Sequence, residues 1–181
     1  MSRKIVKGLV GLCVLFALAL TSTAHAQLLA GPQVGYDTES ESAGVGVNGL
    51  IPLPISQTQT LFLNPGFSWY FVEGDVTLWT VDANVQYPFP MESSLVPFVG
   101  AGLGLQRWSV DVPETSVDVP GFGSFSTGGD VNSTDLIFNI QGGVQIDTGG
   151  PLTPHAGLTV SVGGTDRLEI GGGIRYAIGG R

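Results

Sequence analysis

The sequence predicts an all-β protein, an eight-stranded antiparallel up-and-down transmembrane β-barrel that follows a cleaved signal peptide. Three observations carry this prediction. Apolar side chains recur at every second position in several segments, which is the period of a strand with two different faces. The 28 glycines and 11 prolines weaken helix interiors. Although the mean hydropathy is +0.30, residues 27–181 contain no apolar run long enough for a transmembrane helix.

Residues 1–26 have the three parts of a secretory signal peptide: a basic start, the apolar segment Gly8–Leu20 and the small-x-small cleavage sequence Ala24-His25-Ala26. The residue before Cys13 is not small, unlike in a lipoprotein signal, so we expect no lipid attachment. We expect residues 27–181 to form one barrel domain, and no disulfide supports it because it contains no cysteine.

The charge of the expected mature chain is strongly negative. Three of the seven basic residues belong to the signal peptide, which leaves four arginines against fifteen acids and a formal charge of −11. A chain this acidic is a poor candidate for binding nucleic acid, so we expect no nucleic-acid partner.

The first three strands are expected at Leu28–Tyr36, Ala43–Leu53 and Thr60–Val72. In the first, apolar residues occupy every second position before an acidic turn. The second alternates valine with glycine until two prolines end it. The third is rich in aromatic residues, and Pro65 predicts a bulge because proline has no N–H to donate to the ladder.

The fourth strand, Val76–Tyr87, has an inner face of threonine, carboxylate and amide side chains. The fifth, Val96–Val110, places glycines on one face. They fit a narrow barrel better than a phosphate loop, because the spacing of a phosphate loop fails and no helix follows. The longest connection, Asp111–Ser133, contains the sequence Ser-Val-Asp-Val-Pro twice. The repeat indicates either strand that continues beyond the membrane and folds back, which we favour, or simple low complexity.

The last three strands include the clearest alternation of the chain. In Thr134–Asp147, one face is apolar and the other carries amides and glycine where a water-facing strand would carry lysine and glutamate. The seventh strand, Pro154–Val162, and the eighth, Leu168–Ile178, alternate in the same way, with a short turn at Gly163–Asp166 between them.

Two observations favour apolar faces turned to lipid over the alternative of a soluble secreted barrel. The polar faces carry few charges, whereas a soluble barrel would display many. Aromatic residues also fall near both ends of the strands, as in the girdles of membrane barrels. The outer girdle is expected to contain Tyr36, Trp69, Phe71, Trp79 and Trp108, and the inner one Tyr87 and Tyr176. Because strict alternation turns Arg107 to the lipid, we expect it at the rim or before a bulge at Trp108.

The inward faces predict a polar network that closes the lumen. Its expected members are amide, carboxylate and basic side chains from most of the strands: Asp82, Asn84, Gln86, Gln106, Asn139, Gln141, His155, Glu169 and Arg175. A buried cation without a carboxylate would be costly, so we expect Asp82 or Glu169 beside Arg175, with Asp82 as the first candidate.

Two segments, VPFVGAGLGLQRW at Val96–Trp108 and LEIGGGIRYAIGG near the end of the chain, resemble strands of the small outer-membrane β-barrel superfamily, the porin-like or opacity-type proteins. The resemblance implies residence in the bacterial outer membrane, contact with its lipids and insertion by the barrel-assembly machinery. Such proteins commonly end in a phenylalanine that this machinery recognises. This sequence ends in Gly-Gly-Arg, although Tyr176 and Ile178 keep the aromatic-apolar spacing.

A monomeric barrel with a structural or surface-interaction role is the function that these features favour. An eight-stranded barrel is just wide enough for its own side chains, so we expect no general diffusion pore. We expect no catalytic residue, cofactor or metal ion. The alternative is a lipid-modifying enzyme that uses Ser161, His155 and Glu169, but the His-x-Ser-Asn run of the lipid A deacylases is absent.

Overall fold

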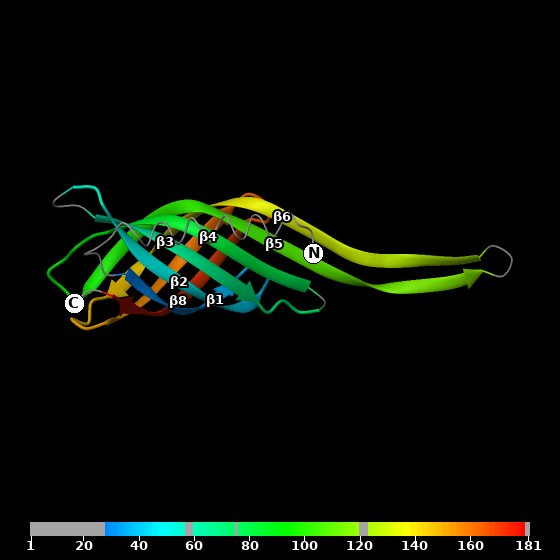
Figure 1. The fold of residues 1–181 in the computed structure, drawn as a ribbon, viewed down its shortest axis with the longest axis horizontal. Helices are drawn as coiled ribbons and strands as arrows, with labels where there is room; N and C mark the ends of the chain where they lie inside the picture. Colours follow the sequence, from blue (N-terminus) through cyan, green and yellow to red (C-terminus); the bar gives the residue numbers. More distant parts are fainter. Residues whose placement is uncertain (1–27, 57–59, 75, 120–122, 180–181) are drawn as a thin grey trace.

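The computed structural model of the chain describes residues 28–56, 60–74, 76–119 and 123–179 (Figure 1). The predicted signal peptide, residues 1–26, lies outside the described residues. Within these four ranges, no helix is long and apolar enough to cross a membrane. The strands are β1 (Leu28–Asp37), β2 (Ser42–Pro54), β3 (Thr60–Tyr70), β4 (Val76–Pro88), β5 (Leu95–Val119), β6 (Gly123–Ile146), β7 (Leu152–Val162) and β8 (Arg167–Ile178).

The eight strands form one closed antiparallel barrel in sequence order, which confirms the predicted fold class. Closure joins β1 to β8, where Val34 lies opposite Gly172. Both Leu28 and Ile178 lie at one end of the barrel, which we call the terminal end. We call the opposite end, where β1 finishes and β8 begins, the hairpin end.

The side chains alternate as the sequence predicts, with apolar residues outside and polar residues inside. Leu136 is 65% exposed on the outer surface, whereas the neighbouring inward residues on the same sheet, Asn139 and Gln106, are 1% and 0% exposed. Across the described residues, polar side chains outnumber apolar ones among those that are buried. The barrel therefore has a polar interior and an apolar belt, the inverse of a soluble protein.

The predicted bulge at Pro65 is wrong. The register of β3 is the same on both sides of Pro65, against β2 as well as against β4. Proline has no N–H for the carbonyl of the opposite residue, Gly49, but the Asn64 side-chain Nδ2 donates to that carbonyl at 2.7 Å. A side-chain donor thus replaces the missing backbone donor, and the strand needs no extra residue.

The hairpin of β5 and β6 extends far beyond the other strands, as Figure 1 shows. Neighbouring strand β4 stops at the pair Val76 and Val110, but β5 and β6 stay paired as far as Val119 and Gly123. One irregularity interrupts their register, between Val112 and Thr115. The prediction that strand continues past the barrel and folds back is confirmed, and both strands are longer than the sequence indicated.

Candidate functional site in the barrel lumen

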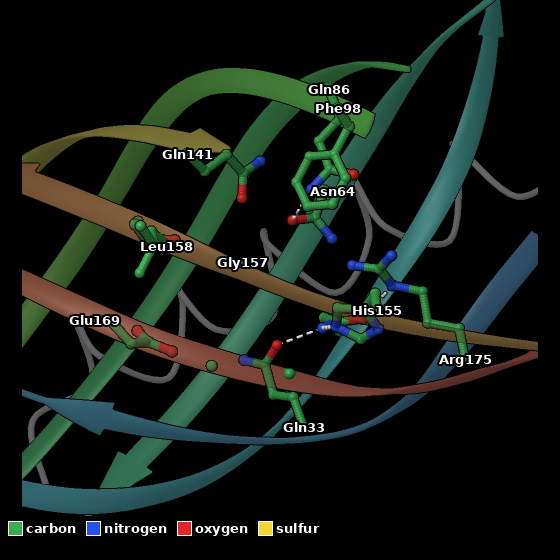
Figure 2. Close-up of a pocket in the computed structure, with 14 residues that line it drawn as sticks. Gln33, Asn64, Gln86, Phe98, Gln141, His155, Gly157, Leu158, Glu169 and Arg175 are labelled. Atoms are coloured by element: carbon green, nitrogen blue, oxygen red, sulfur yellow. Dashed lines mark hydrogen bonds between the residues drawn. The ribbon is translucent and has the colours of Figure 1, made fainter. Parts of the chain in front are cut away.

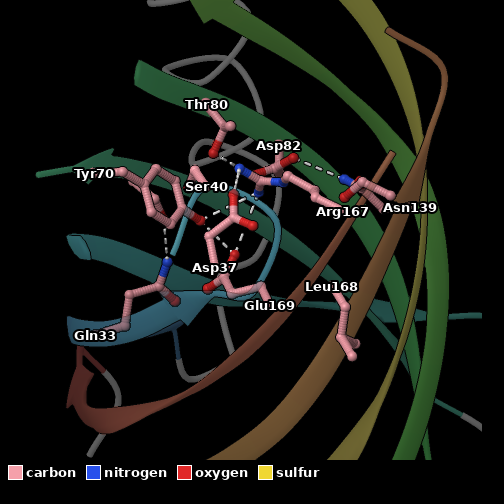
Figure 3. A network of polar contacts seen from close by, with 12 residues as sticks. Gln33, Asp37, Ser40, Tyr70, Thr80, Asp82, Asn139, Arg167, Leu168 and Glu169 are labelled. Atoms are coloured by element: carbon pink, nitrogen blue, oxygen red, sulfur yellow. Dashed lines mark hydrogen bonds and ion pairs between the residues drawn. The ribbon is translucent and has the colours of Figure 1, made fainter. Parts of the chain in front are cut away.

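An arginine that sequence reasoning missed lies at the centre of the charged group near the hairpin end. Arg167 Nη1 lies 3.6 Å from Asp37 Oδ2, and its Nη2 lies 3.3 Å from Glu169 Oε2. Tyr70 completes the group, because its hydroxyl donates to Glu169 Oε2 at 2.5 Å and accepts from Arg167 Nη2 at 3.2 Å. Figure 3 shows these four residues, which we call the Arg167 cluster, converging inside the barrel.

The strand ends explain why the Arg167 cluster forms. Asp37 ends β1 and lies opposite Glu169 on β8, and Arg167 begins β8 two residues earlier on the same inward face. Tyr70 ends β3, and its ring lies 4.9 Å from the guanidinium carbon of Arg167. An aromatic face and two carboxylates thus surround one buried cation, so its charge is compensated on several sides.

Asp82 belongs to a second group, in the middle of the barrel. Its carboxylate accepts from Asn139 Nδ2 at 2.7 Å and from Thr80 Oγ1 at 3.1 Å. Asn139 links further strands, because its Nδ2 also donates to Asn84 Oδ1 at 3.2 Å and its Oδ1 accepts from Ser161 Oγ at 2.8 Å. This group therefore joins β4, β6 and β7 through neutral donors.

Glycines opposite these polar side chains leave the space that they need. Gly104 lies opposite Asp82, and a Cβ at Gly104 would lie 2.3 Å from Asp82 Oδ1. Gly102 lies opposite Asn84, where a Cβ would be 2.4 Å from Asn84 Oδ1. The glycine face of β5 thus accommodates the polar face of β4, as expected for a narrow barrel.

Near the terminal end, a third group surrounds Arg175. Arg175 Nε donates to Asn48 Oδ1 at 2.6 Å, and Asn48 Nδ2 contacts His155 Nε2 at 3.1 Å and donates to Gln33 Oε1. Gln33 Nε2 continues to Ser68 Oγ at 2.8 Å. We call Gln33, Asn48, His155 and Arg175 the Arg175 cluster; it contains no carboxylate.

The predicted pairing of Arg175 with Asp82 or Glu169 is therefore wrong. Among the described residues, the ion pairs are those that Arg167 makes with Asp37 and Glu169. The signal that could have found Arg167 was its spacing of two from Glu169, which gives both side chains the same inward face. The expected turn ended at Asp166 and the expected strand began at Leu168, so Arg167 was assigned to neither.

The other predicted luminal residues are distributed unevenly among the three groups. Gln86 Nε2 donates to Asn64 Oδ1 at 3.2 Å, close to the Arg175 cluster. Gln106 is fully buried, but neither of its amide atoms has a hydrogen-bond partner in the described part of the chain. Gln141 is buried too, and its Nε2 lacks a partner there.

Two small cavities lie between these groups. One has a volume of about 60 Å³, and Figure 2 shows several of its lining residues, among them Gln141, His155 and Arg175. The other, of about 50 Å³, extends toward Asp82 and Arg167. One water needs roughly 10–15 Å³ measured in this way, so each cavity has room for only a few waters.

No protein-family model matches the sequence, and no curated protein matches it significantly. The structure is similar to the N-terminal β-barrel domain of Pseudomonas aeruginosa OprF, with a TM-score of 0.61, 14% identity and coverage of 85% of this chain and 98% of that one. Neisserial surface protein A has a TM-score of 0.56, 19% identity and coverage of 84% and 96%. Ail, the attachment invasion locus protein of Yersinia pestis, has a TM-score of 0.53, 12% identity and coverage of 83% and 97%.

The chain has the fold of the small outer-membrane β-barrels. Together with the apolar belt, this likeness supports the predicted location in the outer membrane. In an outer-membrane barrel, the longer loops face the outside and the short turns face the periplasm. In this barrel the longest connection leaves the hairpin end, and the Arg175 cluster lies toward the terminal end.

The aromatic residues of this outer-membrane barrel lie near both ends of its outer surface, with one departure. Toward the hairpin end, Tyr36, Trp69 and Phe71 are exposed and Trp79 is half-buried; toward the terminal end, Tyr176 is exposed and Tyr87 is half-buried. Trp108 departs from the expected outer girdle. It shares the inward face of Gln106, lies opposite the buried Leu78 and has a buried Nε1.

Arg107, the residue before Trp108, keeps the outward facing that strict alternation gives it. The register of β5 with β6 runs unbroken through Arg107 and Trp108, so no bulge turns the tryptophan outward. Arg107 stays on the outer surface, opposite Trp79, and its Nη2 donates to Asn132 Oδ1 at 3.1 Å. It therefore lies at the rim of the hairpin end, which is the first of its two predicted positions.

The residues of the alternative catalytic set do not come together. His155 contacts Asn48, Ser161 donates to Asn139, and Glu169 is bound by Tyr70 and Arg167. A nucleophile and its base must lie within hydrogen-bond reach of each other, and these three side chains are bound to separate partners. In the described residues, no group of three or more His, Cys, Asp or Glu side chains could hold a metal ion.

Proposed function

We propose that the protein is a monomeric outer-membrane barrel with a structural or surface-interaction role. In this proposal, residues 1–26 are the signal peptide, residues 27–181 form the barrel domain, and the barrel-assembly machinery inserts it among the outer-membrane lipids. The observation that carries the proposal is the hairpin of β5 and β6. Past Val110, β5 continues from Asp111 to Val119, which corresponds to about 30 Å of strand.

The sequence of the hairpin indicates the kind of surface that it presents. No lysine or arginine occurs between Arg107 and Arg167, whereas this part of the chain contains several acids. A partner with a basic surface fits such a hairpin best. Ail, with a similar fold, is described as an attachment invasion locus protein, and an attachment role on the cell surface is part of what we propose here.

We propose further that the lumen is closed to general diffusion. The support is the filling of the interior by the Arg167 cluster, the group around Asp82 and the Arg175 cluster, with cavities of only about 60 and 50 Å³ between them. The separate partners of His155, Ser161 and Glu169 support a non-enzymatic role over the lipid-modifying alternative.

The surface role can be tested on intact cells. An epitope inserted between Val119 and Gly123 should be reached by antibody without permeabilisation, and cells that display the full hairpin should adhere to a polylysine-coated surface better than cells whose barrel lacks residues 112–129. An epitope reached only after permeabilisation, or adhesion that is equal in both strains, would contradict the surface role. Steady large conductance of the purified protein in planar bilayers would contradict the closed lumen.

A further inference from the structure

Arg175 is a buried cation without an ion-pair partner among the described residues. Its side chain is 1% exposed, and its Nε donates to the neutral Asn48 Oδ1. Its Nη1 is buried without a hydrogen-bond partner in the described part of the chain, where no carboxylate lies within ion-pair distance of it. Arg167, which also lies in the lumen, is paired with two carboxylates. Its charge is therefore compensated by opposite charge, whereas Arg175 is bound by a neutral acceptor.

An uncompensated charge in this position is costly. Buried charges in proteins are paired or bound to ions, because the loss of hydration is large and only an opposite charge offsets it. Water supplies hydrogen-bond acceptors but no negative charge. Glu169 lines the same cavity of about 60 Å³ as Arg175, but it lies six residues and about 20 Å from Arg175 along β8, and Tyr70 and Arg167 already bind its carboxylate.

The cavity of about 60 Å³ lies directly against Arg175 (Figure 2). Its wall also includes the Glu169 carboxylate, on the opposite side from Arg175 in Figure 2, where Tyr70 and Arg167 donate to Oε2. Of the other oxygens in the wall, Asn48 Oδ1 accepts from Arg175 and Asn64 Oδ1 accepts from Gln86. Two of its unsatisfied atoms, Arg175 Nη1 and Gln141 Nε2, are donors. The part of the cavity beside Arg175, with an unpaired cation, a free donor and occupied neighbouring acceptors, has the chemistry of an anion site rather than that of a cation site.

We propose that this cavity binds a small inorganic anion of the halide class, with Arg175 as its cationic ligand. The volume sets the class, because a few water-sized spaces hold a monatomic ion and its first waters but exclude a sugar acid or a lipid headgroup. The bound anion compensates Arg175 and stabilises the folded barrel. The inference concerns the half of the lumen toward the terminal end and is independent of the role of the hairpin.

Thermal unfolding of the full protein in detergent tests the site. The folded fraction is followed by gel migration in sodium chloride, sodium bromide or sodium gluconate at equal ionic strength, since gluconate is too large for the cavity. We expect the melting temperature to be several degrees higher in chloride and bromide than in gluconate. This difference should disappear in Arg175→Gln and persist in Arg107→Gln, which removes the same charge from the outer surface.

Equal melting temperatures in the three salts, or a halide effect that persists in Arg175→Gln, would overturn the proposal. Crystals of the unmodified protein soaked in bromide give a test that does not depend on the folding of a variant. An anomalous peak beside Arg175 Nη1 is the expected result. Bromide peaks confined to the outer surface, with the cavity holding only water, would show that no anion site exists.

Discussion

Arg167 and Asp37 connect the last strand of the barrel to the first, with Arg167 Nη1 lying 3.6 Å from Asp37 Oδ2 in the buried interior. The two strands are already paired through their backbones, and Asp37 lies directly opposite Glu169. The ion pair therefore lies at the seam that closes the sheet into a barrel. A charge removed there leaves its partners unpaired in a place that water hardly reaches.

Replacing that arginine should destabilise the barrel strongly. Arg167→Met leaves Asp37 and Glu169 without their cation, and removal of one partner from a buried pair costs about 3–5 kcal/mol. The free energy of unfolding in a urea titration with lipid vesicles measures this effect. Arg107→Met, which removes an arginine hydrogen-bonded to neutral Asn132 on the outer surface, is the control and should cost less than about 1 kcal/mol. Similar losses in the two variants would refute a special role for the cluster.

The apolar belt gives a prediction about the lipid-facing surface. Leu158 is 50% exposed on the outside of β7. Leu158→Arg should lower the free energy of unfolding in vesicles by about 2–4 kcal/mol, because a cation near the bilayer midplane loses its hydration. Leu158→Phe keeps the surface apolar and should fold with nearly the stability of the unmodified protein. If the arginine variant were as stable as the phenylalanine variant, Leu158 would not face lipid.

Two glycines on inward faces should respond differently to a methyl group. At Gly102, a Cβ would lie 2.3 Å from the carbonyl oxygen of Ala83, so Gly102→Ala forces the backbone of β4 and β5 apart and should cost about 1–3 kcal/mol. At Gly66, the nearest atom to a Cβ would be 3.9 Å away, so Gly66→Ala should change the stability little. Urea titrations of both variants compare them directly, and a larger loss in the Gly66 variant would contradict the packing described above.

The hairpin should be dispensable for the barrel. Past Val110, β5 pairs only with β6 among the described residues, so deletion of residues 112–129 removes no contact between the hairpin and the other strands. We expect the shortened protein to keep its heat-dependent shift on gels and to melt within a few degrees of the full protein. Failure of the shortened protein to insert into the outer membrane would instead give the hairpin a role in assembly.

The fold was predictable because alternation is a local signal. Every second residue of Thr134–Asp147 is apolar, and in β6 the apolar face points outward and Asn139 inward. The facing of Trp108 was also present in the sequence, since it lies two residues from Gln106. The expectation of an aromatic girdle overrode that parity, although the register of β5 with β6 gives no bulge to turn the side chain outward.

The pairing of charges was not predictable in the same way. Which carboxylate meets which arginine depends on the height of each residue along its strand, and that height follows from the register between strands distant in sequence. Asp37 and Glu169 lie opposite each other, and Arg167 is two residues before Glu169 on the same face of β8. Asp82, in contrast, lies among neutral donors. Asn64 shows the same limit, because its donation to Gly49 depends on the pairing of β2 with β3.

Barrel closure leaves no strand edge unpaired, but the hairpin of β5 and β6 has two unpaired edges. Within the described residues, β5 has no neighbour on one side after Val110, and β6 has none on its other side before Phe138. Open strand edges are templates for further strands, and natural proteins protect them with charge, proline and local irregularity. The sequence of β5 places Asp111, Glu114 and Asp118 along this edge, and its register shift falls around Pro113. In a crowded membrane, where all copies point the same way, like charge on these edges works against the growth of fibres from one barrel to the next.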